Sequence, residues 1–182
     1  MKRDLLTIPN ALSALRVLLI IPFIEVIFSN RPYARWWGLF WMVLAALTDK
    51  LDGELARKLH CETEWGRILD PLADKIGVGA VAIALLVKQW LPAWFVIVLL
   101  ARDLVILAGG LIIKKSTGEI VPSNMAGKWA VGIIALTLTA ALLDNSSPVV
   151  GFCIAASLVM VAMSTAGYVK RFVQIIHSVS TQ

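Results

Sequence analysis

The 182-residue chain has few charged side chains and few of the residues that cross-link soluble proteins or bind zinc in them. Only 16% of its residues are charged, against about 25% in an ordinary soluble domain, while 59% are hydrophobic. The two cysteines, Cys61 and Cys153, are too few for a disulfide framework. They sit on different segments and the two histidines are isolated, so there is no zinc-type ligand set. These shortages exclude a disordered chain and disfavour a soluble enzyme.

Apolar sequence is abundant instead, with a mean hydropathy of +0.81. A membrane-spanning helix needs about 20 apolar residues, and backbone groups in lipid must satisfy one another, which favours helices. We therefore expect an all-α membrane protein with six transmembrane helices in a single domain, residues 1–182. The second and third apolar segments are short, so their helices should continue into polar sequence. The six segments are 12–28, 36–47, 76–87, 91–113, 125–143 and 149–168.

The net charge of +5 is unevenly divided between the two sides that six spans create. Thirteen lysines and arginines, Arg16 among them, fall on the side of both termini, and only Arg31, Arg35 and Lys88 fall on the other. The positive-inside rule then predicts that both termini are cytoplasmic. The basic residues are interpreted as loop charges at an anionic membrane surface rather than as contacts to nucleic acid. No cleavable signal peptide is expected, because the first apolar segment lacks a small-residue cleavage site.

Acidic residues gather between positions 48 and 75, where the second and third spans should end on the inner side. If the second helix continues, four further residues lie within about 80° of Asp49 around the helix axis and share its face. This face carries two carboxylates, two small residues and a guanidinium: Asp49, Asp52, Gly53, Ala56 and Arg57. A second stripe, spaced by four on the third helix, consists of Gly66, Asp70 and Asp74. A turn between the helices would bring the stripes face to face.

Four carboxylates at one depth cannot all stay ionised without a counter-charge. Carboxylate oxygens are ligands for Mg²⁺, Mn²⁺ or Ca²⁺, and Arg57 offers a forked donor suited to phosphate. Two metal ions between carboxylates, with a cation beside them, suit the chemistry of a diphosphate. For a single aspartate, a solvated loop charge or an ion pair with Lys50, Arg57, Lys58 or Lys75 would be an equally good explanation. Four at helical spacing near the membrane favour a functional site.

These residues resemble the signature of the CDP-alcohol phosphotransferase family, D-x2-D-G-x2-A-R-x8-G-x3-D-x3-D, at all eight fixed positions over 26 residues. The opening of the chain, residues 8–16 with Pro22 beyond them, also resembles the bacterial phosphatidylglycerophosphate synthases of that family. The resemblance implies an integral membrane transferase of phospholipid biosynthesis, which moves the phosphatidyl group from CDP-diacylglycerol to an alcohol and releases CMP. It further implies a homodimer in the cell inner (cytoplasmic) membrane, with the active site facing the cytoplasm.

The resemblance also implies roles for individual residues. Two divalent metal ions, Mg²⁺ or Mn²⁺, would be held by four aspartates, the last of which is also the expected general base: Asp49, Asp52, Asp70 and Asp74. The CDP-diacylglycerol pocket would be lined by Gly53, Ala56, Arg57 and Gly66, with help from Thr48. A threonine at that point can equally hydrogen-bond to its own helix backbone.

The acceptor alcohol is defined less narrowly. Arg102 in the fourth span and Lys128 at the start of the fifth resemble positions of the phosphatidylglycerophosphate synthases, so both are candidates for binding the phosphate of glycerol 3-phosphate. Arg102 could instead form a structural ion pair with Asp103 or with the acidic cluster, because a buried cation is costly unless paired. An arginine followed by aspartate also occurs here in cardiolipin-synthase-like members, whose acceptor would be phosphatidylglycerol.

A function of a different class, a small divalent-ion channel or transporter, would predict polar groups through the full depth of the membrane. Here the four acids gather at the cytoplasmic end. The outer halves are apolar apart from Glu25, which has no assigned chemistry and could pair with Arg31 or Arg35. The sequence therefore favours the transferase.

Overall fold

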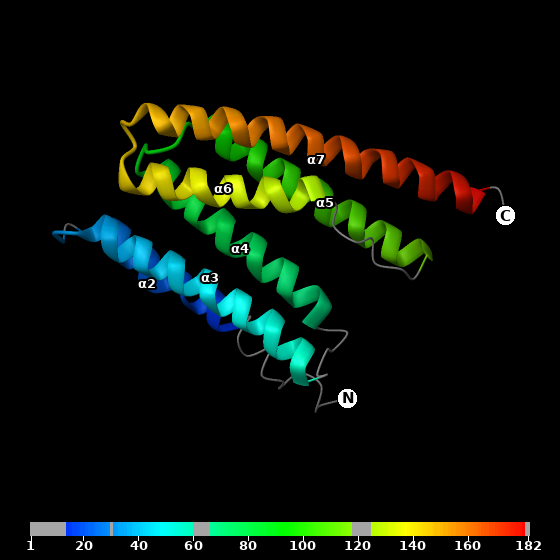
Figure 1. The fold of residues 1–182 in the computed structure, drawn as a ribbon, viewed down its shortest axis with the longest axis horizontal. Helices are drawn as coiled ribbons and strands as arrows, with labels where there is room; N and C mark the ends of the chain where they lie inside the picture. The colour runs from blue at the N-terminus through cyan, green and yellow to red at the C-terminus, as the bar shows by residue number, and fades with distance from the viewer. Residues whose placement is uncertain (1–13, 30, 60–65, 118–124, 181–182) are drawn as a thin grey trace. The chain divides into compact units, whose positions relative to one another are not determined.

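The structure is a computed structural model that describes residues 14–29, 31–59, 66–117 and 125–180. Within these ranges, the side chains of 52–59, 66–71, 111–117, 126 and 171–180 are not described. A helical segment at 14–18 leads into α2 through a turn at Leu19. The helices that follow in the described residues are α2 (Ile20–Phe28), α3 (Ala34–Leu59), α4 (Gly66–Val87), α5 (Ala93–Thr117), α6 (Met125–Leu143) and α7 (Pro148–Ser180), as Figure 1 shows.

The all-helical prediction is confirmed for these residues, and the predicted apolar segments coincide with the helices. α6 has the predicted bounds, while α3 and α4 continue from short apolar segments into polar sequence, as expected. Two helices contain stretches long and apolar enough to cross a membrane, Ala93–Gly110 in α5 and Pro148–Lys170 in α7. A shorter apolar helix runs over Gly127–Leu143. By length and composition, two of the six predicted spans therefore meet this criterion in the described part of the chain.

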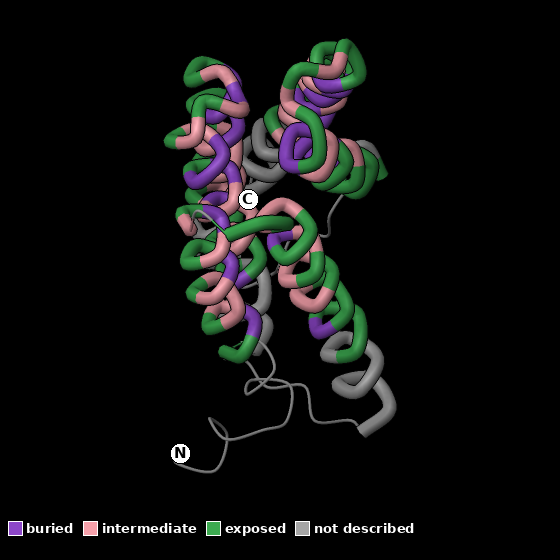
Figure 2. Tube along the Cα trace, turned by 90° about the vertical axis from the view of Figure 1, so that its left-hand side faces the viewer, coloured by how far each residue is buried: buried purple, intermediate pink, exposed green. Residues whose placement is uncertain are grey.

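The chain divides into two compact units, residues 1–88 and 89–182. In the first unit, α2 packs against both α3 and α4. Phe23 and Ile27 form the buried side of α2, and α4 contributes small buried residues such as Ala73 and Ala82. Small side chains allow helix backbones to approach closely. Buried and exposed positions alternate around each helix (Figure 2), so each helix buries one face within its unit.

In the second unit, α7 packs against α5 and α6, and a tight turn joins α6 to α7 (Figure 1). Asp144 Oδ1 accepts hydrogen bonds from the Ser146 N–H at 3.1 Å and from the Ser146 hydroxyl at 2.6 Å. Ser147 Oγ then accepts from the Val149 N–H at 3.3 Å, which is the contact of an N-cap. Pro148 is the first residue of α7, where its missing N–H leaves no hydrogen bond unmade. The local sequence therefore specifies where the second helix of this pair begins.

A buried polar contact joins α6 to α7 in the middle of the pair. Thr137 Oγ1 lies 2.8 Å from the Ser157 hydroxyl, 2.8 Å from the Ile133 carbonyl oxygen and 3.2 Å from the Cys153 carbonyl oxygen. Thr137 and Ser157 are fully buried. Hydroxyl groups that bond across helices in this way satisfy one another and fix the register of the pair.

Candidate functional site

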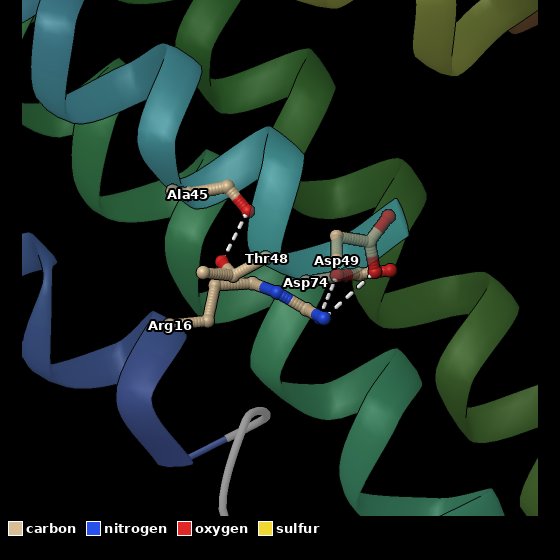
Figure 3. Close-up of polar contacts among 5 residues, drawn as sticks. All are labelled: Arg16, Ala45, Thr48, Asp49 and Asp74. Carbon is tan, nitrogen blue, oxygen red and sulfur yellow. Dashed lines mark hydrogen bonds and ion pairs between the residues drawn. The ribbon is translucent and has the colours of Figure 1, made fainter. Parts of the chain in front are cut away.

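The first and last aspartates of the motif meet at one arginine. Arg16, on the helical segment that precedes α2, places Nη2 2.8 Å from Asp49 Oδ1 of α3. Its Nη1 donates a hydrogen bond to Asp74 Oδ1 of α4. Figure 3 shows the guanidinium reaching both carboxylates. Three helical segments that are far apart in the sequence are thereby joined at a single point within the first unit.

The three groups differ in their access to solvent. The Arg16 side chain is only 5% exposed, whereas the side chains of Asp49 and Asp74 are 51% and 50% exposed. A buried guanidinium requires ionic partners, and two neighbouring carboxylates require a counter-charge. These three side chains together carry a net charge of −1. Their exposed, carboxylate side is therefore suited to a further cation.

Thr48, beside Asp49, is buried and uses its hydroxyl within its own helix. Its Oγ1 donates to the Ala45 carbonyl oxygen at 2.7 Å (Figure 3). This is the backbone hydrogen bond that the sequence left open as an alternative to a role in substrate binding. The Thr48 hydroxyl group therefore stabilises the backbone of α3 next to the acidic cluster.

The remaining motif residues lie on the same two helices. α3 runs as a continuous helix through Asp52, Gly53, Ala56 and Arg57, so the predicted stripe keeps its helical spacing. Gly66 is the first residue of α4, and Asp70 lies one turn before Asp74. The side chains of these six residues lie outside the part of the chain that the structure describes. The structure thus gives their order along two helices, and side-chain geometry for Asp49 and Asp74.

The described carboxylates fit the divalent ions that the resemblance implies. Asp49 Oδ1 and Asp74 Oδ1 approach the Arg16 guanidinium from two helices, so the two carboxylates already converge on one positive charge. Carboxylate oxygens are also the ligands that Mg²⁺ and Mn²⁺ take. Among the described residues, no group of three or more His, Cys, Asp or Glu residues could hold a metal ion. The side chains of Asp52 and Asp70, which would complete the predicted set, lie outside the described part of the chain.

The second unit holds another buried arginine, Arg102 of α5. Its Nη1 donates to Asp103 Oδ1 at 2.6 Å, and its Nη2 donates to Ser164 Oγ of α7 at 3.3 Å. The side chains of Arg102 and Asp103 are 8% and 16% exposed, and Ser164 is fully buried. Within the described part of the chain, Arg102 Nε is buried and has no hydrogen-bond partner. The guanidinium is therefore paired with Asp103, and its Nε–H group makes no hydrogen bond to any described residue.

Lys128, the other candidate for the acceptor phosphate, lies near the start of α6 and is exposed. Glu25 lies 3.8 Å from Arg31 Nη2, and both side chains are exposed. An ion pair of this kind contributes little to stability. Arg31, one of the two partners considered for Glu25, is thus beside it in the structure.

Two residues of these clusters were missed by the sequence reasoning. From the sequence, Arg16 was used for the orientation and, within residues 8–16, for the family resemblance, and was given no place in the site, although a charge inside an apolar segment is itself a sign of function. Ser164 gave no separate signal, but it follows Ser157 and Val161 at helical spacing on the buried face of α7. Both contacts join residues that are far apart in the sequence, 58 positions for Arg16 and Asp74 and 62 for Arg102 and Ser164.

Comparison with known families gives the class of this protein. The family model for CDP-alcohol phosphatidyltransferase matches residues 6–169, which extends across both compact units. The chain therefore belongs to the CDP-alcohol phosphatidyltransferase family. This family membership confirms the resemblance drawn from the eight motif positions and makes the chain a member of a transferase family.

Curated relatives carry two kinds of name. The chain is 36% identical over 150 residues to a CDP-diacylglycerol–glycerol-3-phosphate 3-phosphatidyltransferase of Bacillus subtilis, covering 76% of this chain and 77% of the relative. It is 39% identical over 99 residues to a protein of the same name from Rickettsia bellii, covering 54% and 55%. It is also 32% identical over 145 residues to a cardiolipin synthase (CMP-forming) of Streptomyces coelicolor, covering 78% and 67%.

Proposed function

We propose that the protein transfers the phosphatidyl group of CDP-diacylglycerol to glycerol 3-phosphate, which yields phosphatidylglycerophosphate and CMP. The observation that carries this proposal is the convergence of Asp49 and Asp74 from α3 and α4 within a complete family motif. The names of the Bacillus subtilis and Rickettsia bellii relatives support the same donor and acceptor.

In this proposal, Asp49, Asp52, Asp70 and Asp74 would hold two divalent ions, Mg²⁺ or Mn²⁺, which would supply positive charge to the diphosphate and the leaving CMP. The Asp74 carboxylate takes the proton of the acceptor hydroxyl as its oxygen bonds to the phosphatidyl phosphorus. The bond from that phosphorus to the oxygen of CMP breaks, and CMP departs with the bonding electrons. The cytidine diphosphate is bound by the small residues of the motif and the Arg57 guanidinium, that is by Gly53, Ala56, Arg57 and Gly66. Thr48 stabilises α3 beside them through its backbone hydrogen bond.

Arg102 and Lys128 bind the acceptor phosphate in this proposal. The ion pair with Asp103 orients the guanidinium, and the buried Nε remains as a donor for a phosphate oxygen. Lys128 adds an exposed positive charge at the start of α6. We expect Lys128→Gln to raise the KM for glycerol 3-phosphate and to leave the KM for CDP-diacylglycerol unchanged.

We propose that all six apolar segments span the inner membrane, with both termini and the active site on the cytoplasmic side. The 26 residues of α3 and 22 of α4 rise about 39 and 33 Å, enough for a hydrocarbon core of about 30 Å. Large apolar side chains are exposed along the helices, among them Leu104 and Phe152. The two units then form one catalytic domain, which the family match across both supports, and a homodimer is the expected assembly.

The topology is tested with one cysteine introduced on either side of the apolar stretch of α7, Ser146→Cys in the turn before it or Lys170→Cys at its end, in a Cys61→Ser background. Cys153 is buried and serves as the internal background. A membrane-impermeant maleimide added to intact cells or spheroplasts should label position 146 only, and permeabilisation should add position 170. Equal labelling of both positions in intact cells would contradict the proposed orientation.

The activity is tested by CMP release from purified protein in detergent with CDP-diacylglycerol, Mg²⁺ or Mn²⁺, and glycerol 3-phosphate. EDTA should abolish release, and either metal ion should restore it. Absence of CMP with every alcohol acceptor would refute the transferase.

A cardiolipin-synthase-like activity is the second candidate, because a cardiolipin synthase is among the relatives and Arg102 is followed by Asp103. The same assay separates the two. Release that depends on phosphatidylglycerol and not on glycerol 3-phosphate would replace the first proposal with the second.

A further inference from the structure

Arg16 is placed to organise the acidic cluster before any metal ion arrives. Its side chain is almost fully buried, and its two terminal nitrogens each contact a different aspartate. Asp49 and Asp74 belong to different helices, α3 and α4, and both are half-exposed. The arginine is thus the fixed partner in the cluster, while each carboxylate keeps one side toward solvent.

The charge between the carboxylates has two opposite consequences. Without a metal ion, two neighbouring carboxylates repel each other, and the guanidinium offsets that repulsion. With a divalent ion present, the same positive charge repels the ion and occupies carboxylate oxygens that the ion would use. Arg16 should therefore stabilise the metal-free protein and weaken metal binding.

We propose that Arg16 is a positioning residue, which holds Asp49 and Asp74 together in the metal-free protein and competes with the incoming divalent ion for their carboxylates. The competition rests on the proposed metal site, whereas the positioning of the two aspartates does not. Arg16 thereby keeps the acidic pair assembled at low metal concentration and limits how tightly the metal binds.

The test compares wild type with Arg16→Gln in purified protein, and uses Arg31→Gln as the matched control. Arg31 is in the same unit and its ion pair with Glu25 is exposed. Thermal unfolding is followed in EDTA and in saturating Mn²⁺, and Mn²⁺ affinity is measured by electron paramagnetic resonance. In EDTA, Arg16→Gln should lower the Tm by at least about 5 °C. It should bind Mn²⁺ about tenfold more tightly than wild type, so Mn²⁺ should recover most of the lost Tm.

A merely structural arginine gives a different result. The Tm loss would then be equal in EDTA and in Mn²⁺, and the affinity for Mn²⁺ would stay the same or weaken; either outcome overturns the competition. If Arg16→Gln cannot be purified, Arg16→Lys replaces it, because one ammonium group keeps the charge and loses the fork. Its Tm in EDTA should fall, and a Tm equal to wild type would overturn the positioning role.

Failure of the metal site is distinguished by a cycle that needs no metal. In EDTA, Arg16→Gln is introduced into wild type and into the Asp49→Asn/Asp74→Asn background. The Tm loss should shrink in the second background, because the partner charges are already gone. An equal loss in both backgrounds overturns the positioning role. Absence of Mn²⁺ binding to wild type overturns the competition and the proposed metal site, while the cycle still decides the positioning role.

Discussion

The two buried arginines of this protein have opposite surroundings. Arg16 contacts two carboxylates from two other helices, and both carboxylates are half-exposed. Arg102 contacts one carboxylate, its own neighbour in the chain, and a buried hydroxyl group. Counting only these groups, the first cluster carries a net charge of −1 and the second is neutral. In the described part of the chain, Nε is buried and has no hydrogen-bond partner in both arginines, so the two sites differ in the partners of the terminal nitrogens and in the exposure of those partners.

The comparison shows why burial of an arginine alone does not define its role. A buried guanidinium must be paired in either case, because an isolated buried charge is costly. The difference lies in the partners. Asp49 and Asp74 are half-exposed and can change partners when a ligand arrives, whereas the Asp103 side chain is only 16% exposed and contacts Arg102. Substitutions in the two clusters should therefore affect different measurements.

The largest expected effect is that of Asp74→Asn on catalysis. The substitution removes the proposed base and brings the Arg16 cluster to zero net charge, so CMP release should fall at least about 100-fold. The fold should be retained, because Asp74 is half-exposed and Asn can still accept a hydrogen bond from Arg16. Glu25→Gln removes an exposed carboxylate from the same unit and should leave CMP release unchanged. Full activity of Asp74→Asn would refute its assignment as the base.

Asp103→Asn should have the opposite effect, a large loss of stability with a smaller loss of catalysis. It leaves the buried Arg102 without its carboxylate, which should cost about 3 kcal/mol in the free energy of unfolding and lower the Tm by several degrees. Catalysis per folded molecule should fall less than in Asp74→Asn. Unfolding is followed by circular dichroism in detergent alongside the CMP assay. A stable Asp103→Asn variant would show that the Arg102 pair is dispensable for the fold.

Arg102→Lys sharpens the comparison because it keeps the charge and removes Nε. If Nε binds the acceptor phosphate, the loss of one charge-assisted hydrogen bond should raise the KM for glycerol 3-phosphate about tenfold. The KM for CDP-diacylglycerol should not change. Steady-state CMP release at varied concentrations of each substrate gives both constants. A lowered Tm with both KM values unchanged would assign Arg102 to the structure of the second unit alone.

The difference between the clusters also marks what the sequence could predict. The Arg102–Asp103 pair was one of the alternatives considered for Arg102, because the residues are adjacent. The stripe on α3 was predicted because helical spacing follows from residue number. The contacts of Arg16 could not be foreseen in the same way. Periodicity tells which residues share a face of one helix, but not which other helix packs against that face. Arg16 meets Asp74 because the helical segment just before α2, which carries Arg16, lies beside α4 at this point.

The fold follows the same division. Apolar segments predicted where the helices lie, and the bounds of α6 agree with the prediction. The start of α7 is also determined by the local sequence, because Ser147 caps the helix and Pro148 is its first residue. The buried contact of Thr137 with Ser157 was not predicted, because either hydroxyl could have bonded only to its own helix, as Thr139 and Thr165 do.

Thr137→Val tests whether a neutral buried contact in the second unit is weaker than the charged one at Arg102. Valine keeps the shape and removes the hydroxyl group, so the interhelical bond to Ser157 is lost. The expected cost is about 1 kcal/mol, measured by thermal or denaturant unfolding. Thr139→Val is the matched control, since that hydroxyl bonds within α6 only, to the Ala135 carbonyl oxygen. A loss as large as that of Asp103→Asn would contradict the ranking of charged over neutral buried contacts.

The smallest effect is expected for Arg31→Gln, which breaks an arginine–carboxylate pair with both side chains exposed. The 3.8 Å contact with Glu25 is longer than the 2.8 Å contact of Arg16 with Asp49 and the 2.6 Å contact of Arg102 with Asp103, and solvent screens it. Such a pair contributes less than about 1 kcal/mol, so the Tm should change by no more than a few degrees and CMP release should not change. Measuring Arg31→Gln beside Arg16→Gln separates the effect of losing an arginine from the effect of losing a buried one. Equal Tm losses for the two variants would mean that burial of the arginine does not determine how much its ion pairs stabilise the protein.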